Sequence, residues 1–406
     1  MTSAAPPSFS DDDFVKMLRQ SRPAILSSAG QKQWRSATGC DAVLRLVRDT
    51  TKSDEVHEEC WLTLTAAMQM TPEQKVDPTC DLTDFVVEKG VMDDISTEFE
   101  RLSERSTDVV LVDALACLSG LCLLPRHVPR IIQAGIIPKL LIAGEENVPE
   151  MIAVYSLISL TNLAIHKEAH DALINAGALQ VAERLLQHLE SEDESFMDCG
   201  LSAAFIICRL AGEDGPGLEL IKKNPAVVEN LSWILNEVLV AGPNKAVLGA
   251  NWDPANIVLD VSILSSSAQL RPLMKSFVSL VTTALEKRSK DNRRLVEYSL
   301  SSLSQLITEP SLEDAFKPVK DRLVAYLGQK LPQQKVPSSL IEKGSALKGA
   351  LDRISSVAAS VTSEKRAPTG AEESLGVPCG HTQLSWSGTP EPGYCGLGHT
   401  RFSWGA

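Results

Sequence analysis

Aromatic residues make up only 5% of this chain of 406 residues. A core with so few rings must be built mainly from Leu, Ile, Val and Ala, and these residues suit the packing of helix on helix. No apolar run approaches the roughly 20 residues that a helix needs to cross a bilayer, and residues 1–23 lack the basic region and apolar run of a secretory signal. We therefore expect no membrane insertion and a cytoplasmic location, with the nucleus as the second compartment to consider.

The sequence also lacks the motifs that mark common catalytic sites. It has no glycine-rich loop for phosphates, no nucleophile elbow and no His-Glu pair with the spacing of a zinc hydrolase. His166 and His170 are four residues apart, a spacing that permits metal binding. They follow a long apolar helix in a polar turn, so we expect both to be solvated. We predict that the protein is not an enzyme and that it has no cofactor.

The sequence has fewer basic than acidic residues, and its formal net charge is −13. This balance argues against nucleic acid and anionic lipid as partners, and it favours a protein or peptide partner that is basic or of mixed charge. The nine cysteines are an ordinary number for this length, and several of them, such as Cys117 and Cys208, lie in apolar helical phrases. We expect small buried side chains there and no disulfide framework.

The main feature that is present is a phrase that occurs twice. Residues 131–141 read IIQAGIIPKLL, and 42 residues after Ile131 the chain reads LINAGALQVAERLL. In the first copy a short helix runs into Gly135, a second helix follows, and a longer apolar helix ends at Asn162-Leu163-Ala164 after a polar turn. A unit of this kind cannot bury its own apolar face, so it must stack on similar neighbours.

Weaker copies extend the repeat in both directions. Glycines at positions 39, 90, 135 and 177 follow one another in steps of 51, 45 and 42 residues, which bracket the period of repeats with two or three helices. A long helix after Gly177 should stop at the glycines of residues 212–217, and Asn224-Pro225 should break the next unit. Residues 241–256 interrupt the pattern with Gly and Pro. Helices are expected again over 257–264, 273–285 and 295–307, with a capping pair over 312–316 and 319–327.

These patterns divide the chain into four parts. Residues 1–23 form a tail with a short helix, because Asp11, Asp12 and Asp13 place negative charge at the start of an apolar turn. Residues 24–330 form the repeat domain, and residues 331–361 form a weakly helical linker. Residues 362–406 are rich in Gly, Pro, Ser and Thr and are expected to be a disordered tail.

The repeated unit resembles the armadillo repeat, in which a long third helix ends in Leu-x-Asn-Leu-Ala. The resemblance rests on residues 131–141, 160–164 and 173–179. It is good over about 127–211, degenerate over 38–126 and 220–330, and absent from both tails. It implies an all-α fold, namely an armadillo-like right-handed superhelical solenoid with disordered tails. It also implies a non-enzymatic scaffold or adaptor that binds a partner segment in a groove lined by the long third helices.

Within this resemblance, Asn162 falls where armadillo proteins place an asparagine that bonds the backbone of an extended peptide. The tryptophans that nuclear-import receptors carry four residues earlier are missing, which argues against classical basic import signals as ligands. Residues three, four and seven apart share one helix face. The predicted partner-binding residues are therefore Met151, Tyr155, Ile158 and Asn162 on one long helix and Ser202, Phe205 and Arg209 on the next. Packing between consecutive long helices is the alternative role for the same side chains.

The C-terminal tail contains a second duplication. GHTQLSW, which ends at Trp386, recurs 18 residues later as GHTRFSW, which ends at Trp404. The two copies can act as tandem linear motifs with Trp386 and Trp404 as partner-binding anchors, which would give avidity. A neutral duplication is one alternative. Another is a metal-responsive regulator, because two Cys and two His suffice for a tetrahedral zinc site. Its ligands would be Cys379, His381, Cys395 and His399.

Overall fold

The structure is a computed structural model in which the described part of the chain is helical. It describes residues 9–25, 30, 33–34, 39–68, 82–101, 109–145, 148–191, 194–211, 215–242, 253–290 and 292–354. The helices form consecutive units, and most units end in a third helix that packs on the third helix of the next unit. These third helices are α4 (Asp54–Met68), α7 (Val109–Cys122), α10 (Glu150–Leu163), α13 (Glu194–Ala211), α16 (Pro254–Ser266), α18 (Arg293–Leu306) and α21 (Ser338–Arg353).

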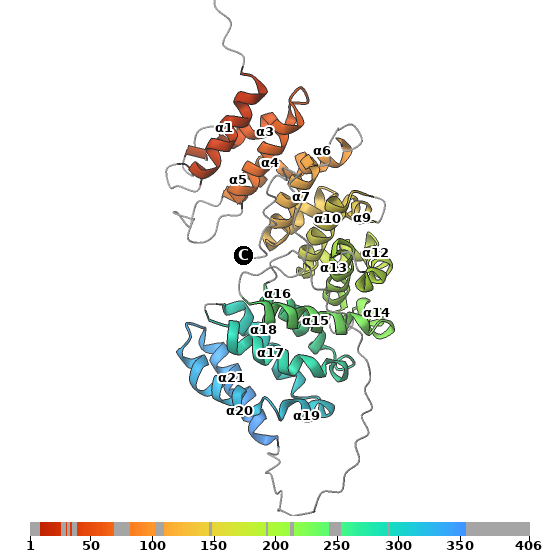
Figure 1. The fold of residues 1–406 in the computed structure, drawn as a ribbon, viewed down its shortest axis with the longest axis vertical. Helices are drawn as coiled ribbons and strands as arrows, with labels where there is room; N and C mark the ends of the chain where they lie inside the picture. Colours follow the sequence, from red (N-terminus) through yellow and green to blue (C-terminus); the bar gives the residue numbers. More distant parts are fainter. Residues whose placement is uncertain are drawn as a thin grey trace, which may run out of the picture.

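The other helices of the units are their first and second helices. They are α3 (Gly39–Arg48), α5 (Leu82–Glu88), α6 (Val91–Arg101), α8 (Val128–Gln133), α9 (Ile136–Ala143), α11 (Lys167–Asn175), α12 (Ala178–Leu185), α14 (Gly217–Lys223), α15 (Ala226–Ala241), α17 (Lys275–Arg288), α19 (Glu313–Phe316) and α20 (Lys320–Ala325). In Figure 1 the units stack in an arc, with α10 and α13 near its middle and α21 at its C-terminal end. The helices α6, α9, α12 and α14 lie along the outer side, and the third helices lie toward the inner side.

Glycine sets the sharp turn between the first and second helices of a unit. Gly135 precedes α9 with φ 65°, and Gly177 precedes α12 with φ 93°, both in the left-handed region that other residues rarely adopt. Gly90 has φ 92° before α6. Gly39 is different, because it begins α3 without a positive φ, and a Cβ there would lie 2.6 Å from Cδ1 of Trp34. Three of the four aligned glycines therefore serve the predicted turn, and the fourth is required for close packing.

The third helices provide the centre of the core. Residues Val110, Ala114, Leu115 and Leu118 of α7 are completely buried, because α4, α6 and α10 pack around this helix. Leu, Ile, Val and Ala supply most of the buried side chains, and the predicted all-α solenoid is confirmed. Cys117 and Cys208 are buried as predicted, and burial raises the pKa of both thiols.

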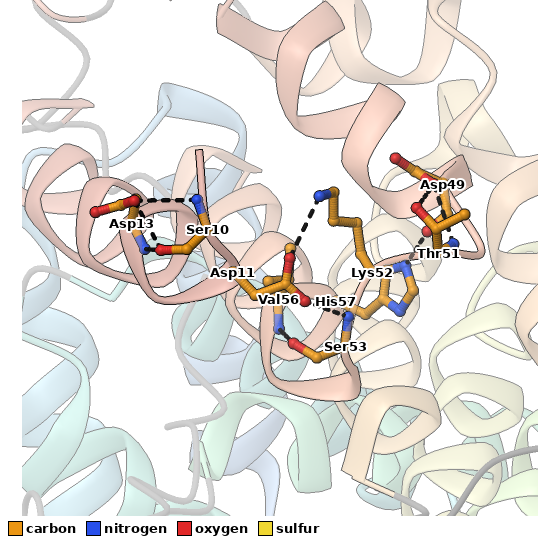
Figure 2. Close-up of polar contacts among 9 residues, drawn as sticks. All are labelled: Ser10, Asp11, Asp13, Asp49, Thr51, Lys52, Ser53, Val56 and His57. Atoms are coloured by element: carbon orange, nitrogen blue, oxygen red, sulfur yellow. Dashed lines mark hydrogen bonds and ion pairs between the residues drawn. The ribbon is translucent and has the colours of Figure 1, made fainter. Parts of the chain in front are cut away.

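The N-terminal helix α1 (Asp11–Ile25) covers the exposed side of α4. Ser10 and Asp13 form a capping box, in which the Ser10 amide donates to the Asp13 carboxylate at 3.0 Å and the Asp13 amide donates to the Ser10 hydroxyl at 3.2 Å. The Asp11 carboxylate reaches the start of α4, where it accepts a hydrogen bond from the Ser53 amide at 2.9 Å (Figure 2). The acidic helix start is thus as predicted, but α1 continues past residue 23 and is packed into the solenoid.

Two elements differ from the expected organisation. The helix expected over 257–264, after an interruption of the repeat, is α16 and begins at Pro254. It is the third helix of the unit of α14 and α15 and packs between α13 and α18. The expected linker contains α21, which packs on α18 and α20 and buries Leu340, Leu347 and Leu351. The apolar spacing in residues 338–353 thus builds the last third helix.

In the residues that the structure describes, no single helix is both long and apolar enough to cross a membrane. The pair formed by Val109–Cys122 and Pro125–Gln133, which is bent by 110°, meets that criterion by length and composition.

Candidate binding surface on the third helices

The inner face is defined as the side of the third helices that neither a neighbouring third helix nor a first or second helix covers. On α10 the partly exposed apolar residues are Met151, Val154, Tyr155 and Ile158, which follow the i, i+3, i+4, i+7 pattern of one helix face. Met151 and Tyr155 also pack against the core. Three of the predicted partner-binding residues, Met151, Tyr155 and Ile158, therefore lie on one apolar stripe with access to solvent.

Asn162 is at the end of the same stripe, and its side chain is only 2% exposed. Its Nδ2 donates to the carbonyl of Ser119 in the last turn of α7, at 3.0 Å. One turn later, His166 Nε2 donates to the carbonyl of Cys122 at 2.9 Å. The last carbonyls of a helix lack partners within the helix, and these two side chains supply donors from the next unit. The Asn162 Oδ1 atom is buried without a partner among the described residues.

His166 corrects the sequence analysis, which expected it to be solvated. The residue is 9% exposed, and burial lowers the pKa of its ring. His170 Nε2 donates to the carbonyl of Ala164 at 3.0 Å. Both imidazoles thus bond helix-end carbonyls in the described structure. In the part of the chain that the structure covers, no three His, Cys, Asp or Glu side chains come together in a way that could hold a metal ion.

Arg209 makes the corresponding contact at the end of α10, and it is 3% exposed. Its NH1 group donates to the carbonyl of Thr161 at 2.6 Å. Its Nε and NH2 groups bond the two carboxylate oxygens of Asp260 on α16 at 2.7 and 2.9 Å. Burial raises the pKa of Asp260, and the bidentate guanidinium opposes that effect. Arg209 therefore joins α10, α13 and α16 through a buried ion pair.

Ser202 and Phe205, the other two predicted residues on α13, are also buried, at 7% and 3% exposure. The carbonyl of Ser202 accepts a hydrogen bond from Thr161 Oγ1 at 3.3 Å. The Phe205 ring lies 5.5 Å from the Arg209 guanidinium, as in a cation–π contact. The structure thus gives Asn162, Ser202, Phe205 and Arg209 contacts within the chain, which is the packing role named as their alternative. Their binding of a partner stays a prediction.

Arg271 satisfies the end of α16 in the same way, and sequence reasoning missed it. Its Nε and NH2 groups donate to the carbonyls of Ser265 and Ser266 at 2.7 and 3.1 Å. The acceptors are backbone atoms, which have no sequence signature. The signal in the sequence was only a basic residue shortly after a long helix, as with His166 after α10.

Acidic side chains of α4 pair with arginines of α1 at the N-terminal end of the stack. Glu59 on α4 is 3% exposed and pairs with two arginines of α1, Arg19 at 2.6 Å and Arg22 at 2.5 Å. Arg19 also pairs with Glu55 at 3.1 Å. These ion pairs hold α1 on α4, and both arginines take part in them.

Asp113 on α7 lies next to this network and is 6% exposed. Its Oδ2 atom is buried and has no hydrogen-bond partner in the described structure. The pKa of Asp113 is raised to about 7, mainly by burial and then by the carboxylates of Glu58 and Glu59, whereas Arg22 opposes the rise. Asp113 stands seven residues before Gly120, as Tyr155 stands seven before Asn162, so it takes the position of Tyr155 on its own helix.

Other apolar side chains are exposed on the outer helices. Ile142 on α9 is 72% exposed, and Trp233 and Val240 on α15 are 38% and 73% exposed. Trp233 and Val240 are seven residues apart on α15 and therefore lie on one face of that helix. The tail residues Cys379, His381, Trp386, Cys395, His399 and Trp404 lie outside the described residues.

The chain was compared with known proteins. Its sequence matches no protein-family model and no curated protein. Its structure is similar to the crystal structure of an engineered protein, with 17% identity, a TM-score of 0.54, and coverage of 85% of this chain and 76% of that one. A computationally designed armadillo repeat protein for modular peptide recognition is less similar, with 16% identity, a TM-score of 0.43, and coverage of 55% and 87%.

At these identities the likeness concerns the fold alone. The three-helix units, the left-handed glycine between the first and second helices and the continuous stack of third helices define the class. The fold is an armadillo-like helical solenoid, as the resemblance of the repeated phrase implied.

Proposed function

We propose that the protein is a non-enzymatic scaffold that binds a segment of a partner protein along its inner face. The observation that carries the proposal is the apolar stripe of α10, where Met151, Tyr155 and Ile158 keep partial exposure. Tyrosine and aliphatic side chains of this kind serve as anchors in protein interfaces. The stripe lies near the middle of the arc, where a partner segment can contact several units.

The formal net charge of −13 supports a partner of opposite or mixed charge. An extended segment suits this surface better than a globular partner, because the inner side of an arc is concave. A cytoplasmic location stays a prediction that accompanies this function.

A random peptide library displayed against the full chain provides the test. Peptides selected on the wild type are measured by fluorescence polarisation against two variants with the same substitution, Ile158→Ala on the inner face and Ile142→Ala on the outer helix α9. We expect Ile158→Ala to weaken binding about tenfold or more, as loss of an anchor does. Ile142→Ala should leave the dissociation constant within about twofold. Selected peptides that lose affinity only with Ile142→Ala would place the surface on the outer helices and refute the proposal.

The duplicated tail motif is the basis of a second candidate, a metal-responsive regulator. The observation in its favour is that each copy has one cysteine and one histidine close together, Cys379 with His381 and Cys395 with His399. Native mass spectrometry of the full chain, compared with a Cys379→Ser and Cys395→Ser double variant, tests it. One zinc per chain that disappears in the variant would support the regulator, and a metal-free wild type would remove it.

A further inference from the structure

The exposed residues of α15 form a single stripe along that helix. They are Glu229, Trp233, Asn236 and Val240, which follow one another at intervals of four, three and four positions. Two of the four are large and apolar. By contrast, every exposed residue of α12 and of α17 is polar or charged. The stripe of α15 therefore has the mixed apolar and charged character of an interaction surface.

The helix α17 lies beside α15 and runs in the same direction. The Ser232 hydroxyl on α15 donates to the Ser276 hydroxyl on α17 at 2.9 Å, and nearer the other end Arg288 donates to the carbonyl of Leu239 at 3.3 Å. Lys287 follows Ser276 by about three turns, so it lies on the same exposed side of α17. A cation thus lies beside the C-terminal end of the α15 stripe.

This surface is complementary to itself about a two-fold axis. An axis that passes near Asn236, midway between Trp233 and Val240, brings Trp233 of one copy onto Val240 of another and the reverse. A large ring thus meets a small aliphatic side chain at both contacts. The same axis brings Glu229, one turn before Trp233, to the end of α15 of the second copy, where Lys287 lies. Each apolar contact is then flanked by an acid and a lysine of opposite charge.

Identical patches that meet about a two-fold axis form the commonest kind of homodimer, and tryptophan is enriched among the residues that stabilise interfaces most. We propose that α15 binds the α15 of a second copy of this chain in an antiparallel pair, with Trp233 on Val240 and Glu229 paired with Lys287. Because α15 is not a third helix, the dimer leaves the inner face of both copies open. Two binding surfaces in one particle give avidity for a partner with two segments.

Sedimentation equilibrium of the full chain measures this association, with a protein concentration of up to about 100 μM to detect a weak dimer. About 0.15 M salt screens the repulsion between two copies, each of formal net charge −13. Val240→Asp places an unpaired charge in the contact and should weaken dimerisation about tenfold or more.

The matched control is Ile142→Asp on α9. Ile142 is 72% exposed and Val240 is 73% exposed, and each is the second-last residue of its helix. The control should leave the dissociation constant of the dimer within about twofold. Far-UV circular dichroism of both variants checks that they are folded.

Exchange of the charged residues tests the antiparallel arrangement. Glu229→Lys places lysine opposite lysine in its own dimer, and Lys287→Glu places glutamate opposite glutamate. Each variant should dimerise about tenfold more weakly than the wild type. In a mixture of the two variants, the heterodimer has an acid facing a lysine at both contacts, so it should predominate over both homodimers. Native mass spectrometry with one variant isotopically labelled measures the proportions.

A heterodimer that forms only in the statistical proportion would overturn this inference. Equal dissociation constants for Val240→Asp and Ile142→Asp would also overturn it, because the contact would then lie elsewhere. A monomeric wild type would overturn it too, and would leave the stripe as a site for a helix of another protein. None of these results bears on the inner face, so the proposed function is tested separately.

Discussion

Two buried aspartates on the third helices have opposite surroundings. Asp260 on α16 is fully buried and receives two hydrogen bonds from Arg209 of the neighbouring unit. Asp113 on α7 is 6% exposed, has Glu58 and Glu59 as charged neighbours, and has an oxygen without a partner. Asp260 is therefore a polar group that joins two units, whereas Asp113 has a hydrogen-bond acceptor that the chain leaves unsatisfied. The buried polar side chains around α13 thus bond one another, whereas the acid on α7 keeps an oxygen without a hydrogen-bond donor.

The largest expected effect concerns Arg209. Arg209→Ala leaves the Asp260 carboxylate buried without a counter-charge and the Thr161 carbonyl without its donor. Breaking a buried pair in this way costs about 3–5 kcal/mol. Urea unfolding followed by far-UV circular dichroism should show a lower midpoint.

The double variant Arg209→Met with Asp260→Leu is the control for this prediction. It removes both charges, so it should recover much of the lost stability. If Arg209→Ala lowers the free energy of unfolding by less than about 1 kcal/mol, the ion pair does not join the units. Arg209 would then again be a candidate partner-binding residue.

Replacement by asparagine should change the free energy of unfolding in opposite directions at the two aspartates at pH 8. Asp260→Asn leaves Arg209 without its carboxylate and should destabilise the fold. Asp113→Asn removes a carboxyl whose pKa is raised from 3.8 to about 7, so it should stabilise the fold. The shift is roughly three pKa units, which corresponds to at most about 4 kcal/mol.

The pH dependence of the Asp113 effect has a definite direction. The pKa of Asp113 is higher in the folded chain than in the unfolded chain. The contribution of this carboxyl group to stability is therefore complete below about pH 4 and is lost as the pH rises through about 7. Urea midpoints of the wild type should therefore fall relative to those of Asp113→Asn between pH 5 and pH 8. Parallel curves for the two proteins would mean that Asp113 is adequately solvated and would remove the contrast with Asp260.

A smaller effect is expected for Asn162. Asn162→Ala leaves the Ser119 carbonyl at the end of α7 without its donor, at a cost of about 1–3 kcal/mol. The matched control is Asn236→Ala on an exposed position of α15, where a change within about 0.5 kcal/mol is expected. Equal urea midpoints for the two variants would show that the hydrogen bond between α7 and α10 contributes nothing.

The sequence predicted the architecture best where the turn chemistry is local. Gly135 and Gly177 mark the first-to-second helix turns because the left-handed backbone requires glycine there. The end of α13 at Ala211 and the break at Asn224-Pro225 follow from the same kind of signal. The third helix α16 was not recognised as part of its unit, because the segment before it interrupts the repeat period.

The roles of individual inner-face residues could not be predicted, because their partners are distant in sequence. Arg209 bonds Asp260, 51 positions later, and Asn162 bonds a carbonyl 43 positions earlier. The helical period predicted that Tyr155 and Ile158 share one face of α10, and both are partly exposed, whereas their binding of a partner stays a prediction. It could not show that Phe205 is buried. Nor could it show that Asp113, which takes the position of Tyr155 on α7, has a hydrogen-bond acceptor without a donor.

Hydrogen–deuterium exchange of the full chain, with and without a saturating selected peptide, tests the central claim most directly. Binding along the inner face predicts slower exchange in the segments of α4, α7 and α10, with no change in the outer helices α9 and α12. Protection confined to α9, α12 or α15, or to residues 355–406, would contradict the assignment of the inner face as the binding surface.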